Sequence, residues 1–266
     1  MALIDVHCHL DMIAERVNEQ EMNNLMQKLE KQMKLVITSG VNPKSNRQAL
    51  DFSKKYSFVK ASFGIYPIDA LASEIKVNLT RDIEPFDIDE ELKWIANHKK
   101  ECIAIGEIGL DYKLSPETAN LQKKNFIKIL NFAKKINKPV VIHSRKAEAD
   151  AIKILKELDM KKVILHCFSG KKSLIKEAVN NKWYFTVPAI IKKLDHFKML
   201  VNLVPIEQLL TETDSPFLSP NPNSVNDPTS VKISIEEIAK IKSLLTNYVE
   251  NKIFENARKL FGITSI

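Results

Sequence analysis

The sequence predicts a single (β/α)8 barrel that spans residues 1–266. Two observations support this fold class. Eight short apolar runs alternate with longer amphipathic stretches, and most of the glycines lie at the end of an apolar run. Short runs rich in β-branched residues that alternate with helical patterns are typical of parallel α/β folds. The length fits one barrel, because single (β/α)8 barrels are commonly of this size.

The eight apolar runs are the predicted strands. Each run ends at, or is followed directly by, a glycine, a proline, a histidine or an acidic residue. Nearly continuous hydrophobicity suits strands that are covered on both faces, as in a parallel sheet surrounded by crossover helices. In chain order the predicted strands are Leu3–His9, Lys34–Ser39, Val59–Gly64, Cys102–Glu107, Pro139–His143, Val163–His166, Trp183–Val187 and Gln208–Thr213.

The stretches between the strands show the periodicity of helices with one apolar face. Two less regular segments, Ile68–Asp87 and Ser215–Ser230, predict long loops over the carboxyl ends of the strands. Five glycines suited to tight turns mark the same face: Gly40, Gly64, Gly106, Gly109 and Gly170. The predicted helices are Glu21–Gln32, Lys44–Lys55, Asp89–His98, Ala119–Lys135, Ala147–Leu158, Leu174–Asn180, Ile235–Asn247 and Ile253–Leu260.

Composition and charge restrict the class of protein. Hydrophobic residues make up 44% and charged residues 27% of the chain, which is ordinary for a soluble globular protein and excludes fibrous classes. The net charge of +7 favours nucleic acid as a partner, although solubility explains it equally well. Three cysteines without metal-binding spacing indicate a reducing compartment. With no signal peptide or membrane-spanning run, we expect a cytoplasmic monomer without a membrane partner.

Histidines and acidic residues gather at the predicted strand ends. The first strand ends in His7-Cys8-His9, and because side chains alternate along a strand, both imidazoles face the same side, about 6–7 Å apart. Barrels carry their active sites at the carboxyl ends of the strands. We therefore expect these two residues to converge with four others from later strand ends. The four are Glu107, His143, His166 and Asp214.

Imidazole and carboxylate are the ligands expected for Zn²⁺, Mn²⁺ or a related divalent ion in a hydrolytic site. Six ligands suffice for two ions that share Glu107 as a bridge. A single buried histidine is more often a hydrogen-bonded core residue, but four of the six histidines stand at strand ends. The remaining two, His98 and His196, lie in helical patterns and are predicted to face solvent. The sequence therefore predicts a two-metal hydrolytic site.

Five separated motifs add a resemblance to this pattern. Together they resemble the TatD family of metal-dependent deoxyribonucleases, within the amidohydrolase-like barrels. The segment Asn256–Gly262 is also similar to the closing segment of that family. The five motifs, in chain order, are Asp5-Val-His-Cys-His9, Gly106-Glu-Ile-Gly-Leu-Asp111, His143-Ser-Arg145, His166-Cys-Phe-Ser-Gly170 and Glu212-Thr-Asp-Ser-Pro216.

The resemblance implies a division of the ligands between two divalent ions, which could be Zn, Mn or Mg. The reaction expected is phosphodiester hydrolysis, in which the ions lower the pKa of water and Asp214 accepts its proton. Glu107 is expected to take part in catalysis as the shared ligand. The implied ligands are His7, His9, Glu107 and Asp214 for one ion, and Glu107, His143 and His166 for the other.

Three residues near strand ends are candidate phosphate contacts: Tyr66, Lys113 and Arg145. An exposed position with no substrate role explains each of them equally well. Tyr66 stands where deoxyribonuclease members of the family usually have a histidine. A tyrosine, with an ordinary pKa of about 10, can donate a hydrogen bond but is a poor proton shuttle near neutrality. A second difference is Asn226-Asp-Pro228, where the family commonly has Asn-Glu-Pro.

Three other functions remain open on the sequence alone. The same site could hydrolyse the ester of D-aminoacyl-tRNA, which would make tRNA rather than DNA the partner. A small-molecule amidohydrolase is the second alternative, although those enzymes often carry a carboxylated lysine where this chain has Glu107. The third alternative is a nucleic-acid-binding or scaffold protein with a vestigial site, and the presence of all six ligands argues against it.

Overall fold

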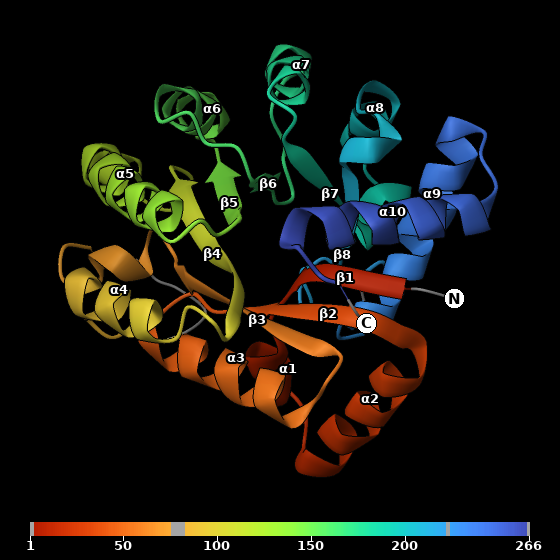
Figure 1. Ribbon diagram of the computed structural model, residues 1–266, viewed down its shortest axis with the longest axis horizontal. Helices are drawn as coiled ribbons and strands as arrows, with labels where there is room; N and C mark the ends of the chain where they lie inside the picture. The colour runs from red at the N-terminus through yellow and green to blue at the C-terminus, as the bar shows by residue number, and fades with distance from the viewer. Residues whose placement is uncertain (1–2, 76–82, 222–223, 265–266) are drawn as a thin grey trace.

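The computed structural model describes residues 3–75, 83–221 and 224–264, and it confirms the predicted (β/α)8 barrel. Eight strands form one parallel sheet in the order β1-β2-β3-β4-β5-β6-β7-β8. Figure 1 shows the helices arranged around the outside of this sheet. The strands are β1 (Leu3–Cys8), β2 (Met33–Ser39), β3 (Val59–Ile65), β4 (Cys102–Asp111), β5 (Val140–Arg145), β6 (Val163–Leu165), β7 (Tyr184–Pro188) and β8 (Leu209–Glu212).

The helices follow the predicted order, and the structure adds α1 and α8. Within the described ranges, no helix is long and apolar enough to cross a membrane. Of the two predicted loops, residues 76–82 and 222–223 lie outside the described part of the chain. The helices are α1 (Leu10–Ala14), α2 (Glu19–Gln32), α3 (Pro43–Lys55), α4 (Ile88–Asn97), α5 (Ala119–Lys135), α6 (Glu148–Glu157), α7 (Lys172–Asn180), α8 (Asp195–Leu203), α9 (Val231–Lys242) and α10 (Thr246–Phe261).

Local signals explain where several helices begin and end. The Asn18 side chain accepts a hydrogen bond from the backbone of Glu21, and the Glu21 carboxylate accepts one from the backbone of Asn18. This reciprocal cap satisfies two amides that the first turn of α2 leaves unpaired. The predicted helix Ile235–Asn247 is wrong at its end, because Ser243 adopts a left-handed conformation with φ 54° and closes α9 at Lys242.

The barrel closes between its first and last strands without a regular ladder among the described residues. Thr211 Oγ1 donates to Ile4 O at 2.7 Å, and the amide of Asp214 donates to His7 O at 3.0 Å. Between these two contacts, the buried carboxylate of Asp5 accepts a hydrogen bond from the backbone amide of Thr213 at 3.1 Å. Individual hydrogen bonds therefore hold β1 beside β8, and the two strands lie together at the centre of Figure 1.

Two glycines allow the strands around β4 to approach closely. A Cβ atom at Gly64 would stand 2.2 Å from the Glu107 amide nitrogen. Gly109 has φ +150°, and a Cβ there would stand 1.9 Å from the carbonyl oxygen of His143. Both distances are far inside van der Waals contact, so only glycine fits at either position.

Candidate metal centre

The structure brings all six predicted ligands to the carboxyl end of the barrel. His7 lies in β1, Glu107 in β4 and His143 in β5. His9 and His166 follow directly after β1 and β6, and Asp214 is the second residue after β8. Four of the six residues are buried, whereas the side chains of His143 and Asp214 retain 14% and 17% of their exposure. The site is therefore shielded from water on most sides and open near Asp214 and His143.

Two imidazole nitrogens face the same two carboxylate oxygens at nearly equal distances. The Nε2 atom of His7 lies 3.5 Å from both Glu107 Oε2 and Asp214 Oδ1. The Nε2 atom of His9 lies 3.6 Å and 3.5 Å from the same two oxygens. These separations are too long for strong hydrogen bonds. They match the ~3.4 Å edge of a tetrahedron around an ion with ~2.1 Å bonds.

Hydrogen bonds to the Nδ1 atoms of two histidines determine which ring nitrogen can bind an ion. His9 Nδ1 lies 2.9 Å from the carbonyl oxygen of Ser39, which can only accept a hydrogen bond. His166 Nδ1 lies 2.7 Å from a Glu212 oxygen in the same way. Each Nδ1 therefore carries a hydrogen, and in the neutral ring the Nε2 lone pair faces the site. This arrangement is typical of histidines that bind metals.

His7 supplies a further observation that fits a metal ion. Its Nδ1 lies 3.0 Å from the Ser39 hydroxyl, whereas its Nε2 is fully buried and has no hydrogen-bond partner among the described residues. A buried nitrogen without a partner loses the hydrogen bonds it had in water, and leaving it so is costly. A divalent ion between His7, His9 and Asp214 would remove this cost, and these three residues meet the spacing that one ion requires.

The two oxygens of Glu107 face different sets of histidines. Oε2 faces His7 and His9, while Oε1 lies 2.7 Å from His143 Nδ1 and 3.8 Å from His166 Nε2. Glu107 thus occupies the position that a bridging ligand requires. The second set differs from the predicted grouping of Glu107, His143 and His166, because His143 contacts Glu107 directly. The spacing that fits one ion is instead found for His7, Glu107 and His166.

The charges in this group shift the pKa values of its members in opposite directions. Burial lowers the pKa of His7, but the carboxylates of Asp214 and Glu107 outweigh burial and raise it well above the ordinary value. Burial also opposes the shift at His143, where Asp111 and Glu107 raise the pKa to about 9. Burial raises the pKa of Asp214, and the nearby imidazoles of His7 and His9 bring it far below its usual range.

Sequence reasoning missed three residues that orient the predicted ligands. Ser39 contacts both His7 and His9, Glu212 contacts His166, and Asp111 Oδ2 lies 3.2 Å from His143 Nε2. Such outer contacts fix the tautomer and the direction of a ligand. A signal was present for two of them, because Glu212 and Asp111 are carboxylates inside the strand-end motifs. Ser39 ends an ordinary apolar strand and gave no signal.

The loop after β8 is held in place by Asn226. Its Nδ2 donates to the carbonyl oxygens of Thr213 and Phe217, at 3.0 Å and 2.8 Å. Asp214 lies between these two residues and has a left-handed backbone, with φ 53°. An aspartate tolerates this conformation better than most residues do. Asn226 therefore helps to fix the position of the Asp214 carboxylate.

The three candidate phosphate contacts lie in two different environments. Lys113 and Arg145 are exposed and line one open cavity of about 700 Å³ beside the site. Tyr66 is half-buried, and its hydroxyl donates to Asp111 Oδ2 at 2.7 Å. Burial and the carboxylates of Glu107 and Asp111 raise the pKa of Tyr66 above its ordinary value, so the phenol keeps its proton.

The two remaining histidines are partly buried rather than solvated, so that prediction is wrong. His98 stacks on Trp94, with ring centroids 4.1 Å apart, and its Nδ1 lies 2.8 Å from the Trp94 carbonyl oxygen. His196 Nε2 lies 3.1 Å from the carbonyl oxygen of Phe168. The His98 ring satisfies a carbonyl group of its own helix, and the His196 ring satisfies one in the loop that follows β6. Hydrophobic periodicity reveals neither contact.

A parallel barrel with imidazoles and carboxylates spaced for divalent ions at its carboxyl end defines the class of protein as a metal-dependent hydrolase. The chain belongs to the TatD family: the model of that family, described as TatD related DNase, matches residues 4–262. The resemblance seen in the five motifs is thereby confirmed across nearly the whole chain.

Individual relatives agree with this assignment. A protein of Methanocaldococcus jannaschii named as a metal-dependent hydrolase is 34% identical over 258 residues, which cover 97% of this chain and 96% of that protein. The human deoxyribonuclease TATDN3 is 31% identical over 269 residues, with 98% and 95% covered. The crystal structure of the TatD homologue YjjV of Escherichia coli has a TM-score of 0.83, with 98% of each chain covered at 20% identity. That likeness supports the fold.

Proposed function

We propose that this metal-dependent hydrolase is a deoxyribonuclease that cleaves phosphodiester bonds with two divalent ions. The observation that carries the proposal is the position of Glu107, whose two oxygens face two different sets of histidines. The substrate class is supported by the human relative, which is named a deoxyribonuclease. The net charge of +7 is compatible with a polyanionic substrate.

In this proposal, His7, His9, Glu107 and Asp214 hold the first ion. Glu107, His143 and His166 would hold the second. Zn²⁺, Mn²⁺ and Mg²⁺ are the candidate ions, and the donor set of imidazole and carboxylate favours the first two. The predicted monomeric state and cytoplasmic location stay predictions.

Bound ions would supply an activated water and polarise a phosphoryl oxygen. Residues of the chain accept the proton, bind the phosphate groups and exclude water. Neighbouring imidazoles hold the pKa of Asp214 far below its usual range, so the side chain is an anionic ligand at neutral pH. In this proposal the same carboxylate also receives the proton of the attacking water. Lys113 and Arg145, at the open cavity beside the site, bind phosphate groups that flank the cleaved bond. Buried walls around His7 and Glu107 exclude bulk water.

Activity on DNA and on D-aminoacyl-tRNA can be separated directly. Metal-stripped protein should be inactive and should regain cleavage of single-stranded DNA on addition of Mn²⁺, Mg²⁺ or Zn²⁺. The tRNA reaction is not favoured by the names of the relatives, and we expect no ester hydrolysis above background. Robust deacylation without DNA cleavage would overturn the deoxyribonuclease proposal, while protein that binds no divalent ion would overturn the hydrolytic site.

Metal binding is expected to release protons near neutral pH. The imidazoles of His7, His9 and His143 have raised pKa values in the ion-free site, that of His143 being about 9. An ion needs their lone pairs and must displace the bound protons, so affinity rises with pH over the range in which these rings titrate. Titration calorimetry at pH 7.5 in buffers with different ionisation enthalpies should show at least one proton released. Equal apparent enthalpies in all buffers would contradict this expectation.

Exchanging Tyr66 for histidine is expected to raise kcat on DNA by about tenfold. An imidazole titrates near neutrality and can shuttle a proton, whereas this phenol keeps its proton. Tyr66→Phe should instead lower kcat, because Asp111 loses the hydroxyl that donates to it at 2.7 Å. Steady-state kinetics of both variants test this, with the exposed Tyr248→Phe as a control. Equal activity of the phenylalanine and histidine variants would argue against a proton shuttle at this position.

A further inference from the structure

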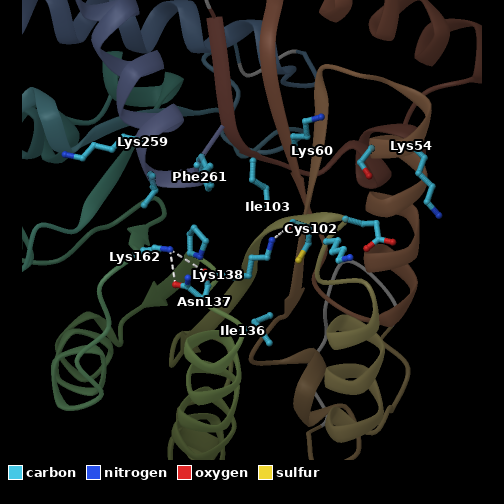
Figure 2. Close-up of a pocket in the computed structure, with 16 residues that line it drawn as sticks. Lys54, Lys60, Cys102, Ile103, Ile136, Asn137, Lys138, Lys162, Lys259 and Phe261 are labelled. Atoms are coloured by element: carbon cyan, nitrogen blue, oxygen red, sulfur yellow. Dashed lines mark hydrogen bonds between the residues drawn. The ribbon is translucent and has the colours of Figure 1, made fainter. Parts of the chain in front are cut away.

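A second cavity, of about 740 Å³, lies at the end of the barrel opposite the metal centre. It is bordered by the starts of β3 and β4, the turns that precede β5 and β6, and the last residues of α3 and α10 (Figure 2). The predicted ligands all stand at the other ends of the strands. This cavity therefore belongs to no part of the proposed hydrolytic site.

Positive charge is concentrated around this cavity. Of the residues that the structure describes, six lysines and one carboxylate, that of Glu101, line it, in a chain whose whole formal excess is +7. Ten other lysines form ion pairs with aspartate or glutamate. None of the six has an ion pair with any described residue. The six are Lys54, Lys60, Lys100, Lys138, Lys162 and Lys259.

Three of these ammonium groups donate hydrogen bonds to uncharged oxygen atoms. Lys138 Nζ donates to the Cys102 carbonyl oxygen at 2.6 Å, and Lys162 Nζ donates to the Asn137 side chain at 2.9 Å, as Figure 2 shows. Lys60 Nζ donates to Ser57 O at 3.1 Å. A neutral carbonyl group accepts a hydrogen bond from the ammonium group but does not neutralise its positive charge. Neighbouring ammonium groups therefore repel each other. Their convergence creates a positive potential that attracts an anion.

Helix ends explain only part of this cluster. Lys54 and Lys259 lie in the last turns of α3 and α10, where an ammonium group stabilises the helix dipole. The other four stand beyond the helix ends, in turns or at strand starts. Among these, Lys60 and Lys138 are half-buried, and each donates a hydrogen bond to a backbone carbonyl group. Helix capping therefore accounts for two of the six lysines.

We propose that this cavity, named the basal lysine pocket after its six lysines, binds a small phosphorylated molecule of nucleotide size. Lysine is a common phosphate-binding residue that acts as a point charge, and the six lysines supply several such charges within one cavity. Ile103, Ile136 and Phe261 give it an apolar side against which a ring can pack. Its volume lies in the range of small-molecule sites. A nucleic-acid strand would instead need an extended track of cations.

The test uses adenosine diphosphate as the probe, titrated calorimetrically into the metal-loaded full-length protein at low ionic strength. We expect saturable binding, with adenosine and inorganic phosphate each at least tenfold weaker. The variant K60A/K100A/K259A should weaken binding at least tenfold. The control K31A/K176A/K232A removes the same charge from exposed positions on α2, α7 and α9 and should stay within twofold of the wild type.

Folding is monitored in the same preparations. Lys100 and Lys259 are exposed, so the double variant K100A/K259A should fold normally and still weaken binding severalfold. Metal-dependent hydrolysis should persist in all these variants, because the pocket lies opposite the hydrolytic site. Absence of saturable binding, or equal weakening by the pocket and control variants, would overturn the proposal. So would loss of oligonucleotide binding in the pocket variant with binding of the diphosphate unchanged.

Discussion

Replacement of Asp214 by asparagine is expected to lower kcat on single-stranded DNA by about a thousandfold or more. The substitution keeps the size of the side chain and removes its charge. Two losses combine: the first ion loses an anionic ligand near His7 and His9, and the proton acceptor proposed for the reaction is gone. Because the amide oxygen remains a weak ligand, we expect metal affinity to fall less steeply than kcat.

The matched control for this variant is Asp195→Asn. The Asp195 side chain is 94% exposed on α8 and pairs only with Lys198 among the described residues. Its kcat should stay within twofold of the wild type. Steady-state cleavage rates and bound-metal content, measured on the same samples, separate chemistry from ion loss. Full metal-dependent cleavage by the Asp214 variant would remove that residue from the mechanism.

Replacement of Glu107 by glutamine is expected to abolish measurable hydrolysis and to reduce bound metal to one ion or fewer. Glu107 is nearly buried, and its two oxygens face both sets of histidines. A neutral amide cannot bridge two cations, because the charge that offsets their mutual repulsion is lost. This variant should therefore affect the second ion as well as the first, which distinguishes it from the Asp214 variant.

Metal analysis and thermal unfolding test the bridging role. In the wild type, added ions should raise the melting temperature, because they bind only the folded site. In the Glu107 variant, this increase should shrink strongly. The exposed Glu236→Gln on α9 serves as the control and should behave as the wild type does. Two firmly bound ions in the Glu107 variant would show that this carboxylate is not the bridge.

The sequence predicted the barrel well because hydrophobic runs and strand ends are local signals. Strand alternation placed His7 and His9 on one side, and the rule for barrel active sites brought them together with Glu107 and Asp214. The structure agrees with that convergence. The contacts between individual ligands could not be predicted from the sequence. The contact of His143 with Glu107, for example, depends on the rotamers of side chains from two different strands.

Features that arise from packing between distant segments gave little sequence signal. The end of α9 is one case, since Lys242-Ser-Leu-Leu contains no glycine or proline and its periodicity continues past the true end at Lys242. The lysines of the basal lysine pocket are a second case. They are scattered along the chain, and only the fold brings them together at the amino-terminal ends of the strands. Ser39, likewise, acquires its role only when β1 and β2 are paired.

The junction of β1 and β8 has a consequence for the order in which the protein is made. Ile4 and Thr211, which hydrogen-bond across it, are 207 residues apart in the chain. His7 and His9 leave the ribosome early, whereas Asp214 follows only when most of the polypeptide has been synthesised. A nascent chain lacks a complete hydrolytic centre until then. A chain that is incompletely translated, or truncated before β8, therefore lacks a residue that the proposed hydrolysis requires.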